Sequence, residues 1–460
     1  MKNKYISVGL IGYGLVGKGV VRNLEENKKI ALRKISKPIR IKSICDLRPI
    51  DKPKLYVKNF MDIVEDPEID LIVELVGGYE PARTIIIESL KAGKNVVTAN
   101  KAVLAKYWDQ IFTAAQDYQK LVYYEASVGG VIPVVQGLSE GLACEDILEI
   151  KGILNGTTNF ILSEMTKHGV TYEAALKSAQ IAGFAEADPS FDVNGIDTAN
   201  KLAILSSLAW GGWIKVEDIS IEGIANLDIE DVLITQGFGY DVKLIGSAQK
   251  TKDGIDLSVQ PCLVNKDHAF ATVKNEYNAV MITGKDAGDV LFYGKGAGQR
   301  PASSAVVSDI INLSKFIVTN TAGIVPNVVY DKEKKIKILP SGKSKAPYYL
   351  RFEVLDKPDV LSKILWILGK CKVSIANLEQ LGVSSNGYTR IIILTHETYR
   401  ENLEKALKQI NATRSIIKSK TVKIKVELQS NNSLTLINSK LLKTLFTKFN
   451  LERGENIGVD

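Results

Sequence analysis

The sequence predicts an α/β protein that begins with a doubly wound parallel sheet and ends with a smaller βαββαβ module. Residues 5–11 form a β-branched apolar run that leads directly into a glycine-rich turn and then into a helical pattern. Strand and helix patterns alternate from there to about residue 135, as a parallel sheet with helical crossovers requires. A charged stretch at residues 331–347, which contains Gly, Ser and Pro, has the composition of a linker and precedes a unit with a different element order.

The N-terminal unit is expected to span residues 1–135 and to have the Rossmann-type arrangement of such sheets. Val20, Val21 and Leu24 recur at helical spacing after the glycine-rich turn. Residues 28–38 resemble an insertion before the second strand. The other predicted elements are strands at Pro38–Cys45, Ile69–Val76, Asn95–Thr98 and Leu121–Glu125, and a helix at Pro81–Ala92.

The middle of the chain, residues 136–330, mixes strands, helices and glycine turns without strict alternation. This pattern indicates an α+β domain. A helix near residues 301–320 has two interpretations, because it can belong to this domain or pack back onto the N-terminal unit.

The C-terminal unit, residues 348–428, is predicted to be a ferredoxin-like module. It opens with an alternating strand at Tyr348–Val354, and the apolar residues of the next helix, Val360–Leu368, share one face. The extension at residues 429–460 is expected to carry one amphipathic helix. The later elements are strands at Val373–Ala376, Thr389–Leu394 and Val422–Leu428, and helices at Glu401–Ile410 and about Leu436–Phe449.

The composition is that of an ordinary globular protein, since 45% of the 460 residues are apolar and 24% are charged. It excludes a disordered chain, a collagen-like chain and a disulfide scaffold. The nearly uncharged stretch Leu202–Ile214 is too short to span a bilayer, so we expect a buried helix there. Residues 1–20 lack the cleavage pattern of a signal peptide, and we therefore expect a cytoplasmic protein.

Cysteine, histidine and charge counts exclude further chemistries. The four cysteines are scattered, which is typical of free thiols in a reducing compartment. The three histidines have no metal-ligand spacing, so neither a zinc site nor a Ser-His-Asp triad is expected. The formal net charge is only +7 and much of it lies near the C-terminus, which disfavours nucleic-acid binding.

The glycine motif GYGLVG lies between a predicted strand and a predicted helix, the context in which it binds dinucleotides. Gly12 permits the tight turn, Gly14 lets the backbone approach a pyrophosphate, and Gly17 lets the helix pack closely on the strand. The N-terminus of the helix then faces the anion.

Residues after the second predicted strand give opposite indications about the cofactor. Asp46 would bind the ribose hydroxyls of NAD, whereas Arg48, with Lys52 nearby, would bind the 2′-phosphate of NADP. The choice between NAD and NADP stays open at this level.

Three charged residues are candidates for substrate chemistry. Lys101 follows the strand NVVT, at the carboxyl edge where ligands bind in parallel sheets. Asp197 and Lys201 are four residues apart and share one helix face next to the apolar run LAIL. A lysine at the edge of a buried helix is costly unless it is paired or functional. The alternatives are a solvated loop lysine and a surface ion pair.

A second glycine cluster, GKGAG at Gly294–Gly298, precedes a predicted helix start at Ala302. It is either a loop that closes over the cofactor or a simple turn.

Taken together, these segments resemble homoserine dehydrogenase over about residues 5–330, and the C-terminal unit resembles an ACT domain, an amino-acid-sensing module often appended to that enzyme. The matching segments are, in order, GLIGYGLVGKGVV, VVTANKAVLA, YEASVGGVIPVV, ILNGTTNFIL, GFAEADPSFDVNGIDTANKLAIL and YGKGAGQRPASSAVVSDI.

The resemblance implies reduction of L-aspartate 4-semialdehyde to L-homoserine with NADP or NAD, in threonine, methionine and isoleucine biosynthesis. It implies that Lys201 is the proton donor, that Asp197 orients it, and that residues 136–330 catalyse and dimerise. The implied substrate-binding residues are Glu186, Asp192, Asp197, Lys101, Gly156 and Thr157. The implied cofactor-binding residues are Gly12, Gly14, Leu15, Val16, Gly17, Arg48, Lys101 and Gly298. A monovalent cation, usually sodium, would bind at Glu125, Val128, Gly130 and Ile132.

The sequence departs from the family pattern in three places. Val131 replaces a glycine in the cation loop, and Phe184 replaces a tyrosine near the substrate. Asp359 replaces a glycine that would let the backbone approach an amino-acid effector. Because of Asp359, we expect threonine inhibition to be weak or absent. ACT modules usually pair, so we also expect a homodimer or homotetramer.

Two other functions fit the sequence less well. A dehydrogenase acting on aspartate itself is disfavoured by the NKA, NGTTN and AEADP segments. A catalytically inactive amino-acid sensor is disfavoured because Lys201, Asp197 and Glu186 are all present.

Overall fold

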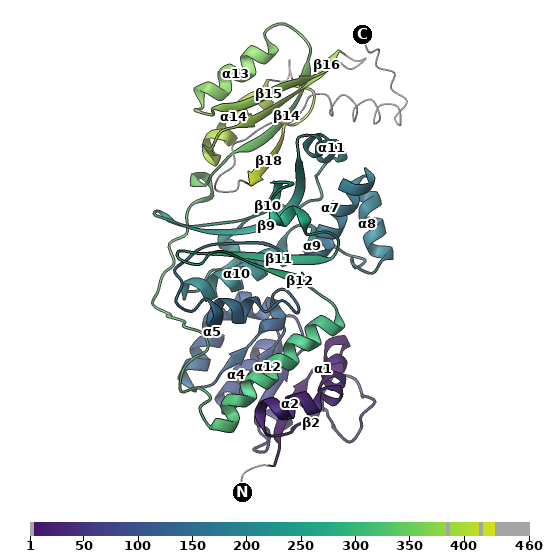
Figure 1. Cartoon of the computed structure of the whole chain (residues 1–460), viewed down its shortest axis with the longest axis vertical. Helices are drawn as coiled ribbons and strands as arrows, with labels where there is room; N and C mark the ends of the chain where they lie inside the picture. Colours follow the sequence, from purple (N-terminus) through teal and green to yellow (C-terminus); the bar gives the residue numbers. More distant parts are fainter. Residues whose placement is uncertain (1–3, 383–386, 414–416, 428–460) are drawn as a thin grey trace.

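The computed structural model describes residues 4–382, 387–413 and 417–427. The chain forms three parts stacked along one axis, with the N-terminal part at one end and the C-terminal unit at the other (Figure 1). The predicted helix at residues 436–449 and the end of the last predicted strand lie outside the described residues.

The N-terminal part is a parallel sheet of order β3-β2-β1-β4-β5-β6, which confirms the predicted sheet class. Residues expected as an insertion form α2 and the turn after it. Its strands are β1 (Ile6–Ile11), β2 (Ile39–Cys45), β3 (Tyr56–Val57), β4 (Leu71–Glu74), β5 (Asn95–Thr98) and β6 (Val122–Tyr123). Its helices are α1 (Leu15–Glu26), α2 (Lys28–Ile35), α3 (Met61–Val64), α4 (Ala82–Lys91) and α5 (Lys101–Asp117).

Several predicted boundaries were wrong. The strand predicted at Ile69–Val76 is β4, Leu71–Glu74, and the helix start predicted at Ala302 lies at Gln299, directly after the turn at Gly298.

β6 ends at Tyr123 instead of Glu125, because Glu125 begins a 3₁₀ helix and its backbone N–H donates to Asp309. β15 (Ile375–Leu381) begins later than the predicted strand Val373–Ala376, because the backbone turns at Lys372, whose φ is +62°. It also ends later, because its residues up to Leu381 pair with the next strand.

Helix α12 (Gln299–Thr319) returns from the middle of the chain to the N-terminal part. It contacts α1 and α2, and its residues Val306, Ile310 and Leu313 share one core with Val8 and Leu10. The long helix therefore joins the N-terminal and middle parts (Figure 1).

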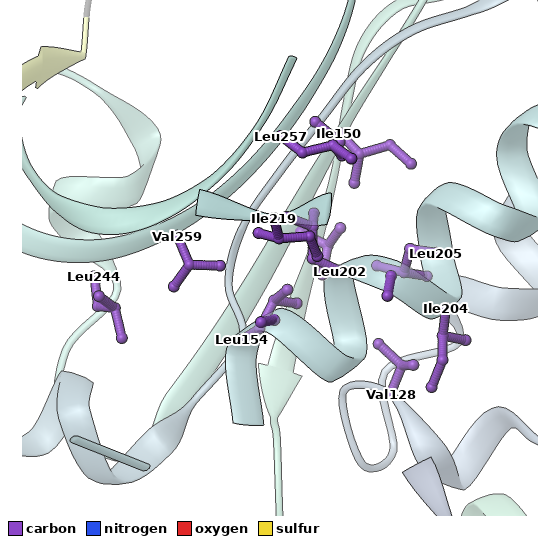
Figure 2. Packing of buried hydrophobic residues seen from close by; sticks show 14 of the residues in the cluster. Val128, Ile150, Leu154, Leu202, Ile204, Leu205, Ile219, Leu244, Leu257 and Val259 are labelled. Carbon is purple, nitrogen blue, oxygen red and sulfur yellow. The ribbon is translucent and has the colours of Figure 1, made fainter. Parts of the chain in front are cut away.

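The middle part is built on antiparallel strands in the order β12-β11-β7-β9-β10, with the short β8 parallel to β10. Helix α10 packs on this sheet, and its Leu202 and Leu205 belong to the same apolar core as Leu154 and Val259 (Figure 2). Its strands are β7 (Ile147–Ile153), β8 (Ser220–Ile221), β9 (Tyr240–Thr251), β10 (Gly254–Asn265), β11 (Tyr277–Gly284) and β12 (Gly288–Lys295). Its helices are α6 (Val134–Gln136), α7 (Gly156–His168), α8 (Tyr172–Ile181), α9 (Ser190–Val193), α10 (Ile196–Trp210) and α11 (Ile229–Gly237).

The C-terminal unit has the strand order β18-β14-β16-β15 with antiparallel neighbours. Its outer strand β18 also pairs in parallel with β10, so the sheet of the middle part continues into the C-terminal unit. The elements are β13 (Lys345–Ala346), β14 (Tyr348–Leu355), α13 (Val360–Lys370), β15, β16 (Tyr388–Thr395), β17 (Thr398–Tyr399), α14 (Arg400–Ala412) and β18 (Val422–Glu427).

Buried ion pairs hold the C-terminal unit on the middle part. Arg351 of β14 donates from Nε to Asp231 of α11 at 2.5 Å, and the Tyr349 hydroxyl donates to the same carboxylate at 3.0 Å. Lys151 of β7 lies 2.5 Å from Glu427 of β18. Breaking one partner of such a pair leaves an uncompensated buried charge, so the junction is specific.

Among the described residues, we find no helix with the length and apolar character needed to cross a bilayer.

Candidate active site

Asp197 joins two lysines at the start of α10. Its Oδ1 lies 2.6 Å from Lys101 Nζ, and its Oδ2 lies 2.7 Å from Lys201 Nζ. The carboxylate is 2% exposed and the Lys101 side chain is 37% exposed, so the cluster is buried around Lys201 and meets solvent at Lys101. Lys201 Nζ also donates to the backbone oxygen of Leu154 at 2.6 Å.

The local sequence explains how these side chains are placed. Gly195, with φ +83°, turns the chain into α10, and Asp197 lies in the first turn, where the helix dipole favours a carboxylate. Lys201 follows one turn later on the same face. Lys101 is the first residue of α5, whose N-cap Asn100 accepts a hydrogen bond from the backbone of the helix.

The charges of the cluster shift one another's pKa values. Burial alone would raise the pKa of Asp197, but Lys201 and Lys101 lower it below its usual range. Burial lowers the pKa of Lys201, and the positive charge of Lys101 lowers it further, while Asp197 opposes both effects. Lys201 is therefore a weaker base and a better proton donor than an exposed lysine.

Asn155, which the sequence reasoning missed, connects the two carboxylates of the site. Its side-chain N–H₂ group donates to Asp192 Oδ1 at 2.7 Å and to Asp197 Oδ2 at 2.8 Å. Its Oδ1 caps α7 by accepting from Thr158 N at 2.8 Å. The available signal was the Asn that precedes the helical pattern in ILNGTTNFIL, because Asn is a favoured N-cap.

The other implied substrate residues lie around this cluster. The Thr157 hydroxyl donates to the Phe184 backbone oxygen at 2.7 Å and lies 3.1 Å from Asp192 Oδ2. Gly156 packs so closely that a Cβ would lie 2.8 Å from the backbone oxygen of Glu276. Glu186 is exposed and is not hydrogen-bonded through its carboxylate to any described residue, although its charge raises the pKa of Lys101.

The glycine motif forms an open turn at the end of β1. Gly12 has φ +101°, and Gly17 packs so closely that a Cβ would lie 2.2 Å from the Gly12 backbone oxygen. Apart from the residues next to it in the chain, no described residue has an atom within 4 Å of the position of a Cβ on Gly14, which leaves open space at the start of α1. Leu15 is 67% exposed there, while Val16 is half-buried. This cradle fits a pyrophosphate that approaches the backbone of the turn.

Asp46, which follows β2, is hydrogen-bonded to the glycine-rich turn. Its Oδ2 accepts from Tyr13 N at 2.6 Å and its Oδ1 accepts from Arg48 N at 3.1 Å. Arg48 is exposed, whereas Lys52 lies 3.4 Å from Glu25. Of the two cations considered for a 2′-phosphate, Arg48 is the one whose side chain makes no ion pair with a described residue.

The second glycine cluster reaches the same turn. Gly298 precedes α12, and the side chain of the next residue, Gln299, donates to the Leu15 backbone oxygen at 2.8 Å. At the neighbouring strand end, the buried carboxylate of Glu74 accepts from the Thr98 hydroxyl at 2.6 Å. Sequence reasoning missed Glu74, since an acidic residue inside an apolar run carries no distinctive pattern.

The loop expected to bind a cation is buried around Glu125. The carboxylate accepts from Val135 N at 2.8 Å and Gln136 N at 2.9 Å, and burial raises its pKa to about 7. The backbone oxygens of Val128 and Gly130 accept no hydrogen bond from the described residues, whereas that of Ile132 accepts from Val134 N. Buried carbonyl oxygens without donors suit a hard cation, so Glu125, Val128 and Gly130 fit such an ion better than Ile132 does.

Comparison with known proteins identifies the family to which the chain belongs. Residues 12–125 match the model "Homoserine dehydrogenase, NAD binding domain", and residues 133–311 match the model "Homoserine dehydrogenase". The chain belongs to the homoserine dehydrogenase family. The homoserine dehydrogenase of Neisseria gonorrhoeae is 38% identical over 416 residues, which cover 89% of this chain and 96% of that protein. The enzyme of Bacillus subtilis is 37% identical, over 89% of this chain and 95% of its own length.

Solved structures of homoserine dehydrogenases share the fold. The enzyme of Thiobacillus denitrificans has a TM-score of 0.87 and 39% identity, over 92% of this chain and 98% of that chain. A hyperthermophilic archaeal homoserine dehydrogenase mutant in complex with NADPH has a TM-score of 0.58 and 26% identity, over 67% of this chain and 97% of that chain. The chain is thus an oxidoreductase of this family with an NAD(P)-binding domain.

Proposed function

We propose that this chain catalyses the reversible reduction of L-aspartate 4-semialdehyde to L-homoserine with NADPH or NADH. The observation that carries the proposal is the Lys101–Asp197–Lys201 cluster. It lies where Lys101, the first residue of α5 after β5, meets the start of α10. Because β1, β4 and β5 are parallel neighbours, Lys101 and the glycine-rich turn are at the same edge of the sheet.

Lys201 is the proposed proton donor. An ammonium group has three N–H donors, and Lys201 uses two of them on Asp197 and Leu154. The third is available to the carbonyl oxygen of the substrate. The bound nicotinamide cofactor supplies the hydride. As negative charge develops on the oxygen, Lys201 stabilises it and then transfers its proton, while Asp197 holds the lysine in place.

The ammonium group of the substrate is proposed to bind between Glu186 and Asp192, with Gly156 and Thr157 forming the adjacent wall. Glu186 has both carboxylate oxygens available, whereas Asp192 Oδ1 already accepts from Asn155 and its Oδ2 lies 3.1 Å from the Thr157 hydroxyl. Lys101, which reaches solvent, is assigned to the substrate and to the edge of the cofactor.

For the cofactor we favour NADP, with NAD tolerated. The exposed guanidinium of Arg48 is available to a 2′-phosphate, and the Asp46 carboxylate that would repel one already accepts two backbone N–H bonds. The residues proposed to hold the cofactor are Gly12, Gly14, Leu15, Val16, Gly17, Arg48, Lys101 and Gly298.

A sodium ion is proposed to bind Glu125 and the backbone oxygens of Val128, Gly130 and Ile132. Support comes from the buried carboxylate and from the two carbonyl groups that no described residue satisfies. Such an ion would fix the loop that leads into α6.

The C-terminal unit is proposed to be an ACT domain of ferredoxin-like topology that helps to assemble a homodimer or homotetramer in the cytoplasm. Its strand order β18-β14-β16-β15 supports the assignment. We place the domain at residues 348–428, after the linker 331–347, with residues 1–135 and 136–330 as the nucleotide-binding and catalytic domains.

The test of the catalytic proposal is an absorbance assay of NADPH with aspartate semialdehyde. Lys201→Met should lower turnover by about 10²–10⁴-fold, while Lys177→Met, on the exposed face of α8, should not. Glu186→Gln should raise the KM for homoserine. Near-normal turnover of the Lys201 variant would contradict the proposed proton donor.

A further inference from the structure

A cavity of about 480 Å³ lies in the middle part of the chain, among α7, α11 and β9. Residues between β10 and β11 complete its walls. None of the residues that line it belongs to the N-terminal part or to the Lys101–Asp197–Lys201 cluster. Its volume is within the range of pockets that bind small molecules.

Lys243 of β9 lines this cavity as a buried lysine that forms no ion pair with a described residue. It is 2% exposed, and its Nζ donates to Asn159 Oδ1 at 3.0 Å and to the Val273 backbone oxygen at 2.5 Å. Both acceptors are neutral, and the carboxylate of Asp241 on the same strand lies 2.5 Å from Lys274 Nζ instead. A buried lysine is rarely found without a negative partner. The third N–H of its ammonium group is available to an anion in the cavity.

The rest of the lining is also positively charged. Lys167, in the last turn of α7, and Lys266, which follows β10, form no ion pair with a described residue. Lys266 Nζ donates to a neutral backbone oxygen of α11 at 3.0 Å. Among the described residues that line the cavity, Asp241 is the only acidic one, so the lining has an excess of three positive charges when Lys243 is protonated. Such a surface attracts a ligand with more than one negative charge.

We infer that this cavity binds a phosphate group, either as the free ion or as the dianion of a phosphate monoester. Lys243 donates its third N–H to one phosphate oxygen, and the long side chains of Lys167 and Lys266 donate to the others. A phosphate monoester has three acceptor oxygens and a charge of about −2, which match the three lysines. A carboxylate has two oxygens and a single charge, so it would leave most of the positive charge uncompensated. The volume beyond the phosphate leaves room for the organic part of an ester.

The charge of Lys243 links this binding to pH. Burial and then the positive charge of Lys274 lower the pKa of Lys243 to about 7, while Asp241 opposes both effects. The other charged groups that line the cavity, Lys167 on α7 and Lys266 after β10, are both cations. A bound anion stabilises the protonated form of Lys243. The affinity should therefore be highest below pH 7 and should fall as pH rises through that value.

The binding test is isothermal titration of the full chain, saturated with NAD so that the glycine-rich turn is occupied by a cofactor without a phosphate monoester. Inorganic phosphate and glycerol 3-phosphate should bind, and acetate should bind at least about tenfold more weakly at the same ionic strength. Tighter binding of glycerol 3-phosphate than of phosphate would identify an ester as the ligand, and equal binding would identify the phosphate ion itself. Acetate that binds as tightly as phosphate, or a chain that binds neither phosphate compound, would refute the inference.

Variants locate the site. Lys167→Met and Lys266→Met change exposed residues and keep the aliphatic stems, and each should weaken phosphate binding by about threefold or more. Lys177→Met, on the exposed face of α8 and outside the cavity, is the matched control and should bind phosphate as the unmodified chain does. Arg48→Ala should also leave phosphate binding unchanged. Unchanged binding in both cavity variants, or a loss of binding in the Arg48 variant, would place the phosphate elsewhere and refute the inference.

The role of Lys243 is tested by pH. Sulfate is the suitable anion, because its charge does not change near neutral pH, whereas that of phosphate does. The dissociation constant of sulfate should rise above pH 7, by at most about tenfold per pH unit, as Lys243 loses its proton. Lys243→Met should bind sulfate more weakly and without this pH dependence, and circular dichroism checks that the variant folds. A dissociation constant that does not change with pH in the unmodified chain would show that Lys243 does not contact the anion.

Discussion

Asn155 donates a hydrogen bond to Asp197, 42 residues later in the chain, and the same amide group donates to Asp192. One side chain thus holds two carboxylates that would otherwise repel each other, one beside Lys201 and one facing the proposed substrate ammonium. Asn155 can do this because its oxygen is used separately, as the cap of α7.

Substitution of Asn155 should therefore reduce catalysis without unfolding the chain. Asn155→Ser keeps an N-cap but loses the amide donors, and kcat/KM should fall by about 10–100-fold, the worth of hydrogen bonds to charged groups. Asn155→Asp also keeps the cap but adds a third negative charge, so its kcat/KM should be lower than that of the Ser variant. Steady-state kinetics check the order, and circular dichroism checks that both variants fold. Equal activity of the Asp variant and the unmodified chain would refute this role.

The lowered pKa of Lys201 predicts opposite pH dependences for the two directions of the reaction. Burial lowers this pKa below that of an ordinary lysine. Aldehyde reduction needs the protonated lysine, so its rate should fall as pH rises through the lowered pKa. Homoserine oxidation needs the neutral form and should accelerate over the same range. Lys101→Met removes a positive charge that lowers this pKa, so both limbs should move to higher pH. If the pH dependences of the two rates do not move in this variant, a group other than Lys201 controls them.

Glu125 predicts a sodium effect that depends on pH. Burial raises its pKa to about 7, so the folded chain without a cation loses stability as pH rises through that value. A cation binds the ionised carboxylate, and the increase in Tm with sodium chloride over choline chloride should therefore be larger above pH 7 than below it. Glu125→Gln should abolish the difference between the two salts. A sodium effect that persists in this variant would place the ion elsewhere.

Arg48 predicts cofactor preference. Because a 2′-phosphate is the only difference between the two cofactors, Arg48→Ala should raise the dissociation constant of NADPH more than that of NADH. Lys52→Met is a control for general positive charge, since Lys52 is paired with Glu25. Equal effects of Arg48→Ala on both cofactors would show that this residue does not contact the 2′ position.

Asp359 predicts a stabilising substitution. Its φ is +72°, a region that suits glycine, and its side chain does not cap α13. Asp359→Gly should stabilise the chain by about 1 kcal/mol and raise Tm, whereas Asp359→Ala keeps the strain and should not. If the proposed ACT site exists, threonine inhibition should also be stronger in the glycine variant. Similar Tm values for the Gly and Ala variants would contradict the strain argument.

Local sequence patterns were enough to predict much of the fold and some of the site. The turn at Gly12 and the alternation of strands and helices depend on steric rules that act over a few residues. The pairing of Asp197 with Lys201 follows from one helical turn. These features need no knowledge of distant contacts, which is why the sequence alone was sufficient for them.

Only the tertiary structure decided which distant groups meet. Lys101 and Asn155 come to Asp197 because the N-terminal ends of α5, α7 and α10 meet at one place, and β18 joins β10 although the two strands are far apart in the chain. The sequence carried no local signal for these contacts, because each depends on the packing of large apolar faces that accept many partners. Long-range pairing is selected by the whole core and by a few buried charges such as Arg351 with Asp231, whose desolvation makes any other arrangement costly.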